Sequence, residues 1–66
     1  MTLESITLHP HQHAKLGRLH VGVTRAGFIS VAGEVHDIAN GEVVRIARVP
    51  VSVIRFDDDY TFSRLE

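Results

Sequence analysis

The chain has 66 residues, with seven basic and eight acidic side chains, a net charge of −1 and no cysteine. A chain of this length forms one small domain, residues 1–66, and buries only about 60% of the surface that its unfolded form exposes. The lack of cysteine excludes disulfides and thiolate zinc sites. The core must therefore depend on close packing, on association, or on a metal held by histidine or carboxylate side chains.

Neither membrane nor secretory signals occur in the sequence. No apolar run approaches the roughly 18 residues of a membrane-spanning helix, and the N-terminus lacks the basic-then-apolar pattern of a signal peptide. We therefore expect a cytoplasmic protein with no membrane partner.

The first third of the chain predicts two strands separated by an ambiguous segment. Residues 1–8 alternate weakly between apolar and polar side chains and predict a strand that ends at Pro10, because proline donates no bond to a sheet. Residues 9–17 predict a loop or a single helical turn that Gly17 ends. Residues 19–24 alternate again and predict a second strand, which a three-residue loop with Gly27 in the left-handed conformation joins to the third.

A long hairpin is predicted for Phe28–Phe56, since both halves alternate with β-branched residues around Asn40-Gly41. Asn-Gly suits a type I′ turn, which needs two residues of positive φ. This turn would pair Val35 with Ile46 and His36 with Arg45.

The apolar pattern changes phase after Ile46. We therefore expect a bulge or bend at Ala47-Arg48, and two strands, 42–47 and 49–56, in place of one. Asp57-Asp58-Asp59 predicts a polar turn, and residues 60–65 predict a last strand.

These patterns predict an all-β fold, a small five- or six-stranded antiparallel barrel or curled meander with little helix. The second face of the predicted hairpin is also apolar, and one flat sheet would leave it in water. Either the sheet closes on itself or a second subunit covers it, so we expect a homo-oligomer, most simply a dimer. The residues of that face are Phe28, Ala32, Ile38, Val43 and Ala47.

Three histidines in an H-x-H-x-H run, His9, His11 and His13, form a candidate metal site. Imidazole is a common ligand of transition metals, and three of them can complete a zinc site with one open position. The alternatives are three surface histidines in a polar loop, or a surface whose charge changes near neutral pH. No other cofactor is indicated.

Arginine outnumbers lysine six to one, and arginine suits planar contacts with phosphate or carboxylate. The candidate binding residues are Arg45, Arg48, Arg55 and His36 on the predicted hairpin. They could bind nucleic acid, but such surfaces normally add aromatic side chains on which bases stack. The near-balanced charge favours arginines scattered over a solvated surface.

No nucleophile motif, phosphate loop or dinucleotide fingerprint occurs, and the three consecutive aspartates lack the ligand spacing of a calcium loop. We therefore expect no catalytic activity. The sequence favours a small interaction module, a regulator, adaptor or inhibitor that binds another protein. Nucleic-acid binding through the arginines and metal binding through the histidines are the alternatives.

Overall fold

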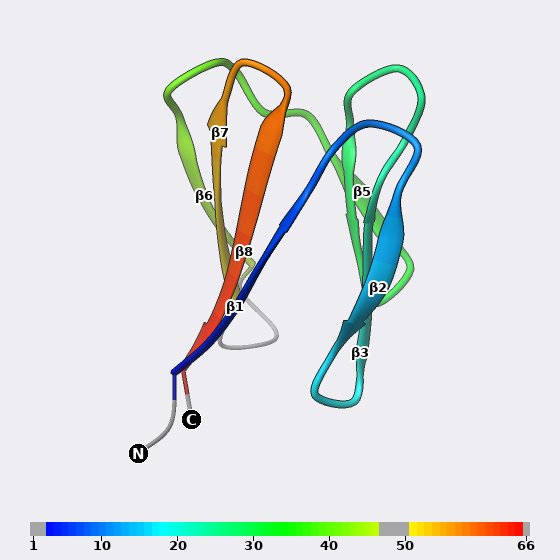
Figure 1. The fold of residues 1–66 in the computed structure, drawn as a ribbon, viewed down its shortest axis with the longest axis vertical. Coiled ribbons are helices and arrows are strands. Elements are labelled where there is room, and N and C mark those ends of the chain that lie inside the picture. Colours follow the sequence, from blue (N-terminus) through cyan, green and yellow to red (C-terminus); the bar gives the residue numbers. More distant parts are fainter. Residues whose placement is uncertain (1–2, 47–50, 66) are drawn as a thin grey trace.

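The computed structural model describes residues 3–46 and 51–65. Eight strands form two antiparallel four-stranded sheets (Figure 1). The first sheet contains, in order, β1 (Leu3–Leu8), β8 (Asp59–Leu65), β7 (Val51–Phe56) and β6 (Val43–Ile46). The second contains β2 (His13–Leu16), β3 (Leu19–Val23), β4 (Ile29–Val31) and β5 (Glu34–His36). Within residues 3–46 and 51–65, no helix is long and apolar enough to cross a membrane.

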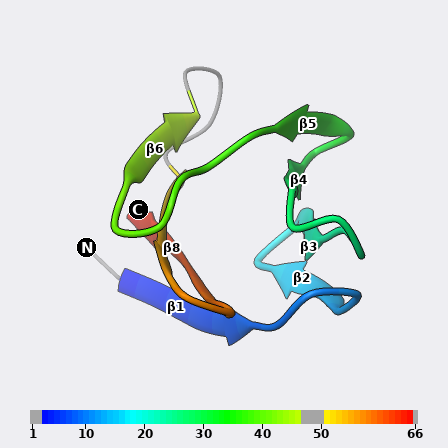
Figure 2. The same cartoon turned by 90° about the horizontal axis from the view of Figure 1, so that it is seen from above.

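The two sheets curve around a common interior (Figure 2). They remain separate sheets and do not close into one hydrogen-bonded barrel. The all-β antiparallel prediction is confirmed, whereas the barrel is not, and the structure has eight strands where five or six were expected. The core is aliphatic and aromatic, and consists of Leu8, Leu16, Val21, Val23, Ile29, Val31, Ile38, Ile46, Val51, Val53, Tyr60 and Phe62.

The register of β8 explains why alternate residues reach this core. Tyr60 lies opposite Leu8 of β1, and Phe62 lies between Ile6 of β1 and Val53 of β7. Tyr60 and Phe62 are 1% and 0% exposed. Because successive side chains of a strand point to opposite faces, Thr61 lies on the outer face of the same sheet.

Several sequence-based predictions are confirmed. The first predicted strand is β1, although it ends at Leu8 and not at Pro10, and the second predicted strand is β3. Gly27 has a φ of 90° in a three-residue loop, which the Thr24 N–H closes by donating to the carbonyl of Phe28 over 2.8 Å. The division of the fourth predicted element is confirmed too, since β6 and β7 are separate strands. The bulge predicted at Ala47-Arg48 lies outside the described residues.

The single strand predicted from Phe28 is wrong. Residues 29–36 form the tight hairpin β4–β5, in which Ala32 and Gly33 have φ values of 51° and 85°. Two consecutive positive φ values are typical of a type I′ turn. The sequence does not indicate this turn, because alanine rarely adopts a positive φ. Val35 consequently pairs with Ser30, not with Ile46.

Asn40-Gly41 forms a turn, but it connects β5 of one sheet to β6 of the other and is not a hairpin. Only Gly41 has a positive φ, of 79°. The Asn40 side chain is used elsewhere, because its Oδ1 accepts the Asp57 N–H over 2.8 Å and its Nδ2 donates to Asp57 Oδ1 over 3.2 Å. These contacts dock the turn against the β7–β8 connection, which explains why a sound turn signal gave the wrong pairing.

The segment 9–17 also differs from its prediction. It begins as a turn, as expected, but residues 13–16 then form β2, whose four residues are too few to show a pattern in the sequence. Gly17, with a φ of 65°, lies in the turn from β2 to β3 and ends no helix.

We expect Phe62→Ala to lower the free energy of unfolding by about 3–5 kcal/mol, because truncating a buried aromatic ring leaves a cavity. Stabilities of about 3–10 kcal/mol are usual for this length, so the variant should be largely or wholly unfolded. The neighbouring substitution Thr61→Ala, on the outer face, should change the free energy of unfolding by less than about 1 kcal/mol. Urea unfolding followed by circular dichroism measures both, and equal losses would contradict the register of β8.

Candidate functional site

The arginines proposed as a binding surface do not share a face. Arg45 lies opposite Ser52, on the outer face of the first sheet, and is exposed. Arg55 is two residues from the buried Val53 and therefore points to the inner side of the same sheet. Arg48 lies outside the described residues.

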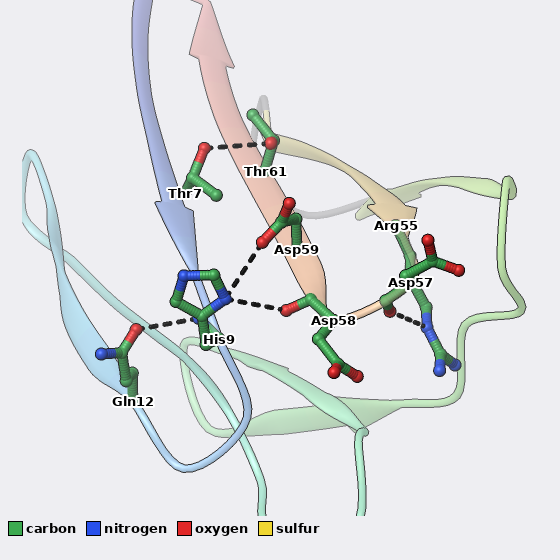
Figure 3. A network of polar contacts seen from close by, with 8 residues as sticks. All are labelled: Thr7, His9, Gln12, Arg55, Asp57, Asp58, Asp59 and Thr61. Atoms are coloured by element: carbon green, nitrogen blue, oxygen red, sulfur yellow. Dashed lines mark hydrogen bonds and ion pairs between the residues drawn. The ribbon is translucent and has the colours of Figure 1, made fainter.

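Arg55 binds its own chain. Its Nη1 donates to the carbonyl of Ile38 over 3.0 Å. Its Nε donates to the carbonyl of Asp57 over 2.8 Å, as Figure 3 shows. Its guanidinium carbon lies 5.3 Å from the centre of the Tyr60 ring, a cation–π distance. The side chain thus holds the β5–β6 connection and the β7–β8 turn against the core, and its Nη1 and Nε donors bind backbone carbonyls of its own chain.

His36 lies on β5 of the second sheet, whereas Arg45 and Arg55 lie on the first sheet. It pairs with the buried Ile29, so it belongs to the inner side of the second sheet. Its Nε2 lies 3.6 Å from Glu34 Oε2 and has no hydrogen-bond partner among the described residues. The structure therefore does not bring His36, Arg45 and Arg55 to one surface.

His9 makes different contacts from the other two histidines of the run. Its Nδ1 lies 3.1 Å from the carbonyl oxygen of Asp58 and 3.0 Å from Asp59 Oδ1, and its backbone N–H donates to Gln12 Oε1 over 2.9 Å (Figure 3). Both partners of the ion pair are more than half exposed, so it adds little stability. These contacts tie the β1–β2 loop to the β7–β8 turn.

His13 lies on β2 of the second sheet, and there His11, His13 and His20 line a depression. Among residues 3–46 and 51–65, no three histidine or carboxylate side chains lie close enough to hold a metal ion. The structure thus does not assemble the predicted set His9, His11 and His13 into a metal site.

The depression has a volume of about 440 Å³ on the outer face of the second sheet. Its floor is Gly22, where an added Cβ would lie only 2.8 Å from the Cβ of His13 and 3.2 Å from the Gln12 carbonyl oxygen. The β1–β2 loop forms one wall and is fixed by two backbone hydrogen bonds, from His11 N–H to the Val23 carbonyl (2.9 Å) and from Val23 N–H to the Gln12 carbonyl (2.8 Å). Thr24 and Ser30 contribute hydroxyl groups to the lining.

Sequence reasoning missed this site, although two signals for it exist. A glycine inside a strand pattern, as Gly22 is, often marks a close approach of another backbone. His20 alternates with Leu19 and Val21 and so belongs to the polar face of its strand. Bringing His20 to His11 and His13 required knowing that residues 13–16 form a strand.

A second feature is an exposed apolar patch on the outer face of the first sheet. Val43 and Phe56 are 57% and 59% exposed. Half-buried Ile54 lies opposite Val43 and two residues before Phe56, so the three side chains share one face. The patch borders β6, which is one of the two edge strands of its sheet.

The chain was compared with family models, curated proteins and solved structures, and none of the three comparisons gives a match. The function is therefore inferred from the geometry of these two surfaces.

We expect Arg55→Met to lower the free energy of unfolding by about 2 kcal/mol, because hydrogen bonds from a charged donor contribute about 1.5–3 kcal/mol. Arg45→Met, on the outer face, is the matched control and should change it by less than about 0.5 kcal/mol. Thermal or urea unfolding measures both. Equal effects would contradict the assignment of Arg55 as a structural residue.

Proposed function

We propose that this protein is a non-enzymatic module that binds an extended segment of another protein as an added strand along β6. The observation that carries the proposal is the combination of an open sheet edge with an exposed apolar patch beside it. Each alone is common in small β proteins. Together they supply the backbone hydrogen bonds and the side-chain contacts that strand addition requires.

The edge of β6 has backbone groups directed away from its sheet. Arg55 N–H donates to the Glu42 carbonyl over 3.3 Å, which fixes the phase of the β6–β7 ladder. Since hydrogen-bonded pairs alternate along an antiparallel ladder, Val44 and Ile46 bond to β7, whereas the N–H and C=O groups of Val43 and Arg45 point outward. Such a row is a template for a further strand.

The side chains beside this edge define the partner's chemistry. Val43, with Ile54 and Phe56 behind it, offers an apolar surface, and Arg45 adds a positive charge on the same face. A partner strand would therefore place apolar side chains toward Val43 and a carboxylate toward Arg45. The apolar contact supplies most of the affinity, because exposed ion pairs contribute little.

The alternatives have weaker support in the structure. The nucleic-acid hypothesis needs Arg45 and Arg55 on one surface, but they lie on opposite faces, and Arg55 binds backbone carbonyls of its own chain. A second copy of this chain is another possible strand donor, and the experiment below separates it from a different protein.

The test is selection from a display library of random peptides, followed by affinity measurement with one enriched synthetic peptide. We expect enriched sequences to alternate apolar residues and to carry an acidic one. Arg45→Pro should weaken peptide binding at least about tenfold, because it removes an outward N–H and a charge. The fold should survive, since proline is tolerated at an edge where the N–H faces solvent.

Val43→Ser should also weaken peptide binding, and Val35→Ser is its control. Val35 is 59% exposed, against 57% for Val43, but it lies on the other sheet. No enrichment of alternating peptides, or undiminished binding by Arg45→Pro, would contradict the proposal. If the free protein forms a dimer in sedimentation experiments that Arg45→Pro dissociates, the added strand comes from a second copy and not from a different protein.

A further inference from the structure

The depression on the outer face of the second sheet surrounds Gly22. Gly22 lies directly opposite His13 on one neighbouring strand and opposite Ser30 on the other. Gly22 is itself buried, and the His13 Cβ and the Gln12 carbonyl oxygen lie only 2.8 Å and 3.2 Å from the position that an added Cβ would take. The groups that a ligand would meet are therefore the side chains around Gly22 and not its backbone.

Polar groups line this depression from several elements. His13 and His20 are diagonal neighbours across β2 and β3, which places their side chains about 7 Å apart. His11 joins them from the β1–β2 loop, and the Thr24 and Ser30 hydroxyls complete the rim. No carboxylate lines the depression within the described part of the chain.

The electrostatics of this face favour negative charge. Lys15 lies directly opposite His20 on the same face, so one permanent cation stands beside the three imidazoles. β4 and β5 contribute Ser30 and Val35 to this face. The acidic Glu34 pairs with the buried Val31 and therefore belongs to the inner side of the sheet.

We propose that this depression binds a small organic anion. The anionic group would accept hydrogen bonds from His13 and His20, with Lys15 nearby. The volume of about 440 Å³ falls within the range of about 300–1,000 Å³ that is usual for small-molecule sites. This site lies on the opposite sheet from β6, so it is independent of the proposed strand addition.

The probe is benzenesulfonate, which keeps its charge across the working pH range, and benzenesulfonamide is its neutral counterpart of similar shape. Titrations followed by amide chemical shifts, with EDTA present to exclude metal bridges, give both affinities. We expect benzenesulfonate to bind at least about tenfold more tightly, as charge-assisted hydrogen bonds require. Its shifts should centre on residues 20–24 and on the β1–β2 loop.

Both probes carry the same ring, so the comparison between them separates recognition of the anionic group from apolar contact with the ring. Equal affinities of the two probes, or shifts centred on the first sheet, would overturn the proposal.

Two variants test the residues that are proposed to hold the anion. His13→Ala and His20→Ala should each weaken benzenesulfonate binding about tenfold, the equivalent of one charge-assisted hydrogen bond. His36→Gln removes a histidine from the inner side of the same sheet and should leave binding unchanged. Melting temperatures show whether each variant is folded, and unchanged binding by both alanine variants would also overturn the proposal.

Discussion

The packing of Tyr60 and Phe62 of β8 between the two sheets is the contact on which this fold depends. Both rings are buried, and the Tyr60 hydroxyl donates to the carbonyl of Gly27, in the β3–β4 loop, over 3.1 Å. Gly27 must be glycine, since its φ is 90° and an added Cβ would lie 3.0 Å from the Tyr60 hydroxyl oxygen. The Arg55 guanidinium lies at a cation–π distance from the same Tyr60 ring. One tyrosine therefore joins the β3–β4 loop, the second sheet and the β5–β6 connection.

Because each sheet buries one face against the other, each has an outer face that solvent reaches. The outer face of the first sheet carries the Val43, Ile54 and Phe56 patch beside an open edge. The outer face of the second carries Gly22 and its surrounding histidines. Two outer surfaces of different chemistry thus share 66 residues, while half-buried Arg55 and His36 point to the inner sides of the sheets.

The candidate site was only partly predictable, because the expected residues are divided by the fold. Alternation in the sequence indicates which residues share a face of one strand, but not which strands are neighbours. His11 and His13 were identified as chemically important. Their neighbour His20 lies on β3, and only the pairing of β2 with β3 places it beside them. Arg55 was expected to face a ligand, whereas its position beside the Ile38 and Asp57 carbonyls gives it a structural role.

The sequence by itself determined the all-β character, the position of the first strand and of β3, and the left-handed Gly27, since each follows from local alternation and backbone sterics. Only the tertiary structure decided that residues 29–36 turn back on themselves and that Asn40-Gly41 passes from one sheet to the other. The physical reason is that turn residues specify a local reversal but not the partner that follows it. That partner is chosen by which apolar faces can bury one another, here around Tyr60 and Phe62.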